Sequence, residues 1–217
     1  MLAEPGYTEP VPTIYSLKPA FQRVLRPVAR MLARAGVKAN HVTVLACALA
    51  VLIGLLLTAR IESRPLFLIL PAFLFLRMAM NAIDGMLARE FSQKSDLGAY
   101  LNELTDVVSD AFLYLPFAYL SIFEPMWIGV VIVLAAVSEM TGTIGVMIGA
   151  SRRYDGPMGK SDRAFVFGAM ATWIGFDGVV AHWVAWLFPR LIALLLVATI
   201  VNRVRSGLAE KKTGPMH

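Results

Sequence analysis

The sequence is poor in cysteine and in charged residues. Its one cysteine, Cys47, cannot form an internal disulfide and lies in an apolar run, where a packing role is expected. Charged side chains make up only 16% of the 217 residues, whereas soluble domains carry about 25%. Residues 1–15 contain three prolines and no apolar core, so we expect no signal peptide there. The chain also lacks repeats and low-complexity segments.

Hydrophobic residues make up 58% of the chain and set its expected organisation. Residues 1–15 form a polar, Pro-rich leader. Residues 16–39 combine apolar side chains with six Lys and Arg residues, which predicts an amphipathic helix on an anionic membrane surface. A solvated surface helix is the alternative, and we favour it less because the next residues enter the bilayer. Residues 40–206 form the membrane domain, and residues 207–217 form a cytoplasmic tail.

Apolar runs within residues 40–206 predict six membrane spans. The first four cover residues 40–59, 65–88, 97–122 and 125–150. The fifth begins near Ala164 and the sixth ends near Arg203, while the turn between them is left open. The predicted fold is therefore all-α: a polytopic membrane protein with six transmembrane helices preceded by an N-terminal amphipathic interfacial helix.

The distribution of basic residues predicts the orientation. Of the 20 Lys and Arg residues, 16 lie on the side of the termini and 3 on the other side, and Arg77 lies within a span. Cytoplasmic segments are enriched in Lys and Arg, so both termini are expected in the cytoplasm. A bacterial inner membrane is the expected location, and a net charge of +5 does not require a nucleic-acid partner.

Two segments carry polar residues at helical spacing, which places each set on one helix face. The sets are Arg77, Asn81, Asp84 and Ala88 in the second span, and Asn102, Asp106 and Asp110 in the third. A short polar link, residues 90–96, lets the third span run back along the second, so the two faces converge. Ionisable residues at this depth indicate a functional site. Oxygen-rich pockets suit Mg²⁺, which usually accompanies phosphate.

The spacing N-x-x-D-G-x-x-A-R-x8-G-x-x-x-N-x-x-x-D, from Asn81 to Asp106, resembles the signature of the CDP-alcohol phosphatidyltransferase family, and in particular its YnbA-type bacterial branch. The resemblance implies transfer of a phosphatidyl group from CDP-diacylglycerol, or another CDP-linked donor, to a hydroxyl acceptor with release of CMP. It also implies a Mg²⁺ or Mn²⁺ cofactor, an active site open to the cytoplasm, contact with membrane lipids and a homodimer.

The same resemblance implies roles for individual residues. The nucleotide-binding set is Asp84, Gly85, Ala88, Arg89 and Gly98. The metal-binding set is Asn81, Asp84, Asn102, Asp106 and Asp110. Asp106 is also the candidate general base for the acceptor hydroxyl.

The sequence departs from the family pattern at Asn81 and Asn102, where the family has aspartate. An amide offers a metal an oxygen without charge. Candidate substitutes are Asp110, Glu103 and Glu139, although Glu139 could instead pair with Arg77. Two metals with recruited carboxylates, one metal, or a degenerate site remain open; we favour retained metal binding, with one ion in the empty protein.

A basic segment, residues 151–163, is the candidate acceptor pocket. Its cations are Arg152, Arg153, Lys160 and Arg163. If they bind the acceptor, glycerol phosphate or a phosphorylated polyol is favoured over a neutral alcohol; the alternative is that they only set the topology. The motif Gly145-x-x-x-Gly149 could support close helix contact.

Two other functions compete with the transferase. One is a catalytically silent lipid- or nucleotide-binding membrane protein derived from such enzymes. The other is a small transporter, which is less favoured because the polar groups cluster at one face instead of forming a path across the membrane.

Overall fold

The computed structural model describes residues 18–213, and this part of the chain is all-helical, with no strand among those residues. Its helices are α1 (Lys18–Arg34), α2 (Ala39–Ala59), the 3₁₀ helix η2 (Arg64–Leu68), α3 (Ile69–Glu90), α4 (Asp96–Tyr114), α5 (Pro116–Tyr119), α6 (Pro125–Met147), α7 (Lys160–Gly175) and α8 (His182–Thr213). The predicted leader, residues 1–15, lies outside the described residues.

Four helical segments are long and apolar enough to cross a membrane: Ala39–Ala59, Arg64–Glu90, Pro125–Met147 and His182–Lys211. Their mean hydropathies range from 1.9 to 2.7. Large apolar side chains such as Leu52, Phe75 and Leu194 point outward, which suits a lipid environment better than water. α7 has only 16 residues and α4 carries several carboxylates, so the number of six spans stays a prediction.

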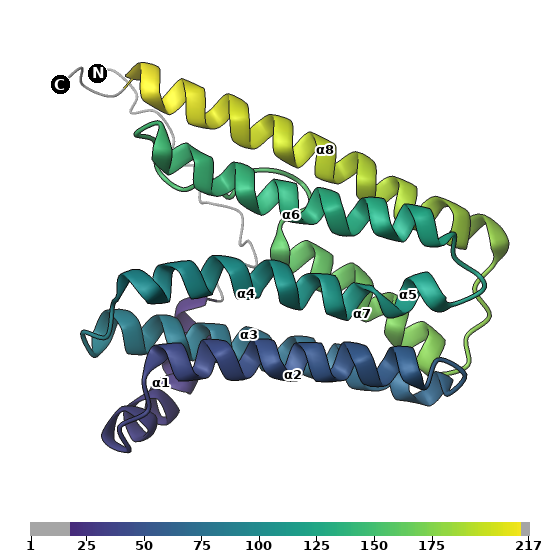
Figure 1. Cartoon of the computed structure of the whole chain (residues 1–217), viewed down its shortest axis with the longest axis horizontal. Helices are drawn as coiled ribbons and strands as arrows, with labels where there is room; N and C mark the ends of the chain where they lie inside the picture. The colour runs from purple at the N-terminus through teal and green to yellow at the C-terminus, as the bar shows by residue number, and fades with distance from the viewer. Residues whose placement is uncertain (1–17, 214–217) are drawn as a thin grey trace, which may run out of the picture.

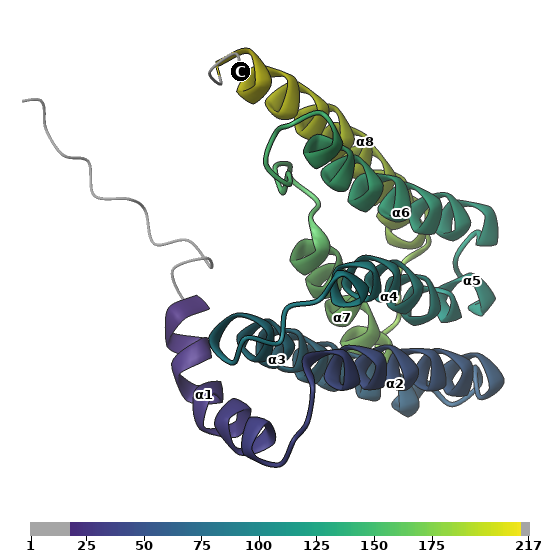
Figure 2. The same ribbon diagram turned by 60° about the vertical axis from the view of Figure 1, so that its left-hand side comes forward.

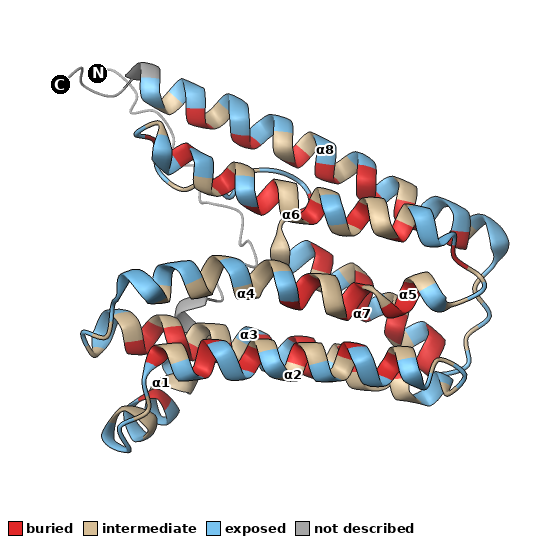
Figure 3. Ribbon diagram, viewed as in Figure 1, coloured by how far each residue is buried: buried red, intermediate tan, exposed pale blue. Residues whose placement is uncertain are grey.

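The helices form two groups, as Figures 1 and 2 show. α6 and α8 run side by side, while α2 packs against both α3 and α4. α7 packs against α3 and η2, and α1 packs against α3 near the α3–α4 link. Each long helix of these groups alternates buried and exposed residues, because one of its sides packs against a neighbour (Figure 3).

The core is strongly aromatic at the end of α4. The ring of Tyr114 stacks on that of Phe167 with centroids 3.9 Å apart, and Phe117 meets Phe167 edge-on at 5.0 Å. These contacts fasten α7 to the α4–α5 corner. A glycine is required where α2 approaches α4, because a Cβ at Gly54 would lie 2.2 Å from the carbonyl oxygen of Phe112.

Several predicted boundaries differ from the structure. The third span was expected to continue to residue 122, but α4 ends at Tyr114 and α5 starts at Pro116, whose missing N–H cannot continue the helical bonding. α7 begins at Lys160, before the expected Ala164, and the turn left open falls at residues 176–181. α8 continues past residue 206, so residues 207–213 of the predicted tail are helical.

The interpretation of Gly145-x-x-x-Gly149 as a helix-contact motif is wrong. α6 ends at Met147, and Gly149 takes a φ of 83°, the left-handed conformation that ends helices. A Cβ at Gly145 would lie 3.0 Å from the carbonyl oxygen of Ser151, so the chain itself fills the space beside this glycine.

Candidate functional site

Asp84 is buried on α3 and is held from α2. Its Oδ2 accepts a hydrogen bond from the Thr43 hydroxyl at 2.8 Å. Asn81 lies one turn earlier on α3 and is half-buried, as the helical spacing predicts. Thr43 was missed by sequence reasoning because a single threonine in an apolar span gives no signal of its partner.

Asp106 on α4 joins three helices. Its Oδ1 accepts a hydrogen bond from Arg77 Nη2 on α3 at 3.3 Å, and it forms an ion pair with Lys160 at the start of α7. Asp84 lies close enough to Asp106 and Lys160 to interact electrostatically with both. The structure therefore brings Asp84 and Asp106 to one site, with a lysine between the helices that sequence spacing did not place there.

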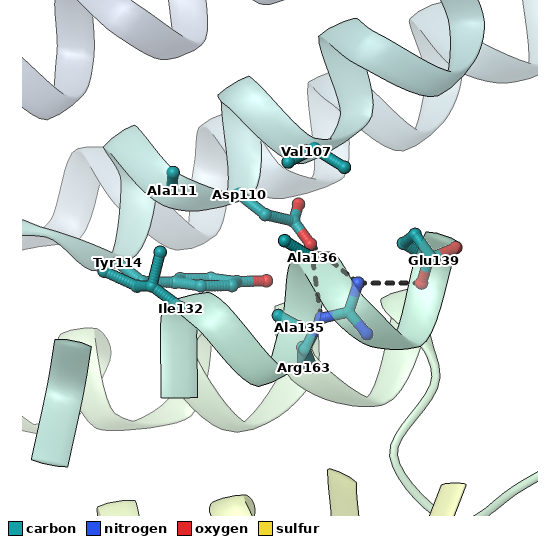
Figure 4. A pocket seen from close by; sticks show the side chains of 9 residues that line it. All are labelled: Val107, Asp110, Ala111, Tyr114, Ile132, Ala135, Ala136, Glu139 and Arg163. Atoms are coloured by element: carbon teal, nitrogen blue, oxygen red, sulfur yellow. Dashed lines mark hydrogen bonds and ion pairs between the residues drawn. The ribbon is translucent and has the colours of Figure 1, made fainter. Parts of the chain in front are cut away.

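Asp110, one turn beyond Asp106, is enclosed by arginines. Its Oδ1 accepts from Arg77 Nη1 at 2.7 Å, and its Oδ2 accepts from Arg163 Nη2 at 2.8 Å. Arg163 also donates to Glu139 Oε1 at 3.0 Å (Figure 4). Both oxygens of Asp110 are thus occupied by guanidinium groups, which makes it a structural anion and not an open metal ligand.

Glu139 on α6 has a different partner from the one that the sequence suggested. It pairs with Arg163 at 3.0 Å, Arg152 at 3.5 Å and Arg203 at 3.6 Å. The suggested pairing of Glu139 with Arg77 is not found, because Arg77 forms ion pairs with the α4 carboxylates Asp106 and Asp110. The sequence did not predict that Arg203 on α8 contacts this site.

The four cations of residues 151–163 lie at the same end of the bundle, and each has a carboxylate partner. Arg152 pairs with Glu103 and Glu139, Lys160 with Asp106, and Arg163 with Asp110 and Glu139. Arg153 pairs with Asp155 at 2.8 Å and also with Glu210. The hydrogen bond from Arg153 lowers the pKa of Asp155 below its usual value.

The expected nucleotide-binding residues frame the α3–α4 end. Arg89 is exposed and folds back over Gly85, where a Cβ would lie 2.8 Å from its Nη2. A Cβ at Gly98 would lie 2.8 Å from Asn40 Oδ1, so α4 approaches the start of α2 closely. Ala88 packs against the apolar cluster beneath α1.

The expected metal site offers two carboxylates and two amides as donors. Within residues 18–213, no group of three or more His, Cys, Asp or Glu side chains is arranged to hold a metal. Asp84 and Asp106 offer two carboxylates, and Asn81 and Asn102 offer uncharged amide oxygens on the same two helices. The amide nitrogen of Asn102 donates to Glu103 at 3.4 Å.

Comparison with known proteins gives consistent matches. The family model for CDP-alcohol phosphatidyltransferase matches residues 37–201. The inner membrane protein YnbA of Escherichia coli strain K12 is 44% identical over 199 residues, which cover 90% of this chain and 96% of that protein.

Solved structures share the fold. The phosphatidylinositol phosphate synthase PgsA1 of Mycobacterium tuberculosis with CDP-DAG bound is 22% identical, with a TM-score of 0.70 over 89% of this chain and 96% of that chain. The same synthase in complex with manganese and citrate is 21% identical, with a TM-score of 0.71 over 89% of this chain and 93% of that chain. The apolar helices and the 44% identity to an inner membrane protein together show that the chain has the character of a membrane protein.

Proposed function

Because the chain belongs to the CDP-alcohol phosphatidyltransferase family, we propose that it transfers a phosphatidyl group from CDP-diacylglycerol, or another CDP-linked donor, to a hydroxyl acceptor. The observation that carries this proposal is the convergence of the polar faces of α3 and α4: Arg77, on the same helix as Asp84 and its D-G-x-x-A-R run, bonds Asp106 at 3.3 Å. The binding of CDP-DAG by PgsA1, which shares the fold, supports a CDP-linked donor.

The reaction is a displacement at phosphorus. The acceptor oxygen forms a bond to the phosphorus of the phosphatidyl group, the bond to the CMP oxygen breaks, and its electron pair leaves with CMP. Asp106 is the group that accepts the acceptor's proton, for which it must be free of Lys160. Arg89, exposed one turn beyond Asp84, donates to the donor's phosphates or cytidine.

A Mg²⁺ or Mn²⁺ ion would be held by Asp84 and Asp106 with amide oxygens of Asn81 and Asn102. When bound, it neutralises charge on the pyrophosphate and stabilises the leaving CMP. The complex of PgsA1 with manganese supports divalent metal use in this family. Asp110 does not belong to the proposed ligand set, because its oxygens are bound by Arg77 and Arg163.

The charges of residues 151–163 are the basis for the proposed class of acceptor. The cations at residues 151–163 favour a phosphorylated acceptor, such as glycerol phosphate or a phosphorylated polyol, provided that an acceptor phosphate replaces their carboxylate partners. Arg152 and Arg153 are half-buried and can make that exchange, whereas Arg163 has no exposed surface. The acceptor contacts are therefore best assigned to Arg152, Arg153 and Lys160.

In the proposed topology, the protein spans the inner membrane six times, with α1 at the interface and both termini and the site facing the cytoplasm. The shorter helices α4 and α7 would then cross beside the four more apolar segments. α1 exposes Arg23, Arg30 and Val24 while Ala29 packs on the bundle, which suits a helix lying on lipid. A homodimer stays a prediction from the family resemblance.

The direct test is release of CMP from CDP-diacylglycerol by the purified protein with Mn²⁺ and a panel of acceptors. We expect CMP only when a hydroxyl acceptor is present, and most with phosphorylated polyols. Binding of CDP-diacylglycerol without CMP release for any acceptor would instead favour the silent binding protein.

Cysteine labelling tests the proposed orientation. With Cys47 replaced by Ala, Ser63→Cys lies between the first two spans and should react with an impermeant maleimide from the periplasmic side. Ser161→Cys, exposed beside Lys160, should react only after the membrane is opened. The opposite pattern would contradict the six-span orientation, and the Cys47-free chain gives the labelling background.

The two asparagines are expected to limit metal binding. Asn81→Asp together with Asn102→Asp adds two negative charges beside Asp84 and Asp106, and should tighten Mn²⁺ binding about tenfold or more, since unit charges 4 Å apart interact by about 1 kcal/mol even in water. Calorimetric titration without nucleotide should show one ion in the wild type, and a second only with nucleotide.

The control for that titration is Asn202→Asp, which adds a charge on the exposed side of α8. Two tightly bound ions in the nucleotide-free wild type, or no gain in the double variant, would show that the asparagines do not limit the site.

A further inference from the structure

We propose that Lys160 is a built-in counter-cation of the metal site: its ammonium group binds Asp106 in the metal-free protein and is displaced when a divalent ion binds there. This inference rests on the metal site of the proposed function and adds a competitor to it. The pairing joins residues 54 positions apart and comes from the fold, not from the signature motif.

Two cations share one oxygen of Asp106, and they differ in their freedom to leave. Arg77 has a side chain only 4% exposed, and its other terminal nitrogen is fixed to Asp110 at 2.7 Å. Lys160 is the first residue of α7, and its side chain is 29% exposed. A lysine ammonium on a flexible four-carbon stem can exchange partners, whereas the enclosed guanidinium cannot. Lys160 is therefore the cation that an incoming metal replaces.

The local charges show why such a cation is needed here. Arg77 and Arg163 offset Asp110 and Glu139, which they bond at 2.7 and 3.0 Å. The two remaining carboxylates, Asp84 and Asp106, carry a formal charge of −2, and the 3.3 Å contact of Arg77 with Asp106 offsets only part of it. Lys160 reduces their sum from −2 to −1 without a metal. A divalent ion that takes its place brings the sum to zero, so the ion and the ammonium group are alternatives at Asp106.

The displaced ammonium has a second use in the same place. Lys160 follows the segment that carries Arg152 and Arg153, and a donor or acceptor phosphate entering there offers it a new anionic partner. Phosphate and metal should then favour each other. A bound phosphate draws Lys160 away from Asp106 and opens that carboxylate to the metal, and a bound metal frees Lys160 to pair with the phosphate. Binding free energies of two ligands are coupled reciprocally in this way.

The test is a calorimetric titration of Mn²⁺ into the full-length protein without nucleotide. Lys160→Gln should bind Mn²⁺ about tenfold more tightly than wild type, which corresponds to about 1.4 kcal/mol. Lys160→Arg, which keeps the charge, should bind like wild type. Lys94→Gln makes the same chemical change at an exposed position of the α3–α4 link and should change nothing. Unchanged or weaker binding in Lys160→Gln, or equal tightening in Lys160→Arg, overturns the proposal.

The wild-type protein provides a second readout that requires no variant to fold. Acylation of Lys160 by acetic anhydride, measured by mass spectrometry, should rise several-fold on addition of Mn²⁺, while acylation of Lys94 stays constant. No rise at Lys160 overturns the competition. CMP release is scored separately: release with no Mn²⁺ effect on Lys160 removes only this inference, whereas the Mn²⁺ effect without release removes only the transferase activity.

Discussion

Replacing Asp84 with alanine is expected to abolish CMP release, with a loss of about a thousandfold or more, which is the upper range for removing one preorganised electrostatic group. The reason is charge. Asp84 is one of the two carboxylates available to a metal, and without it Asp106 stands alone between Arg77 and Lys160. Metal-dependent affinity for CDP-diacylglycerol should be lost together with CMP release.

Two variants make that result interpretable. Thr43→Val removes the hydroxyl that donates to Asp84 Oδ2 but keeps the carboxylate, so it should reduce activity only partly. Glu62→Ala removes an exposed carboxylate from the turn between α2 and η2 and should leave activity unchanged. Undiminished, metal-dependent affinity for CDP-diacylglycerol in Asp84→Ala would refute the assignment of the donor site.

The part of this site that the sequence could predict is the part that local periodicity determines. Asn81 and Asp84 share a face of α3, and Asp106 and Asp110 share a face of α4, because residues three and four apart are neighbours on a helix. Helix type and most helix starts follow in the same way from apolar runs. The family match over residues 37–201 confirms the resemblance that the spaced motif indicated.

Pairings between distant helices could not be predicted, because periodicity does not say which helices are adjacent. Glu139 was expected either to replace a metal ligand or to pair with Arg77, yet α6 lies beside α8, and the carboxylate meets Arg163 and Arg203. The ion pair of Lys160 with Asp106 likewise depends on where α7 begins. Helix ends were misjudged where a single residue decides them, as at Pro116 and Gly149.

The second large effect concerns stability. Arg163→Met should lower the free energy of unfolding by about 3–5 kcal/mol, the range for breaking a buried ion pair by removing one partner. Arg163 has no exposed surface and donates to both Asp110 and Glu139, so its loss leaves two buried carboxylates short of a partner. Thermal unfolding of the detergent-solubilised protein should show the lower stability.

The matched control is Arg26→Met, which breaks the ion pair of Arg26 with Glu90. The side chains of Arg26 and Glu90 are 41% and 37% exposed. Exposed pairs contribute about 1 kcal/mol or less, so this variant should unfold near the wild-type temperature. Arg163→Lys keeps the charge but loses the two-sided geometry of the guanidinium, and should fall between the two.

The same variants separate the two roles considered for Arg163. As a structural cation, it should affect stability and leave the KM for the acceptor unchanged in whatever protein remains folded. As an acceptor ligand, it should raise that KM with little change in unfolding. An arginine enclosed by Asp110, Glu139 and Ser138 has no donor directed to an entering molecule, and a rise in KM at unchanged stability would mean that these carboxylates exchange Arg163 for substrate during turnover.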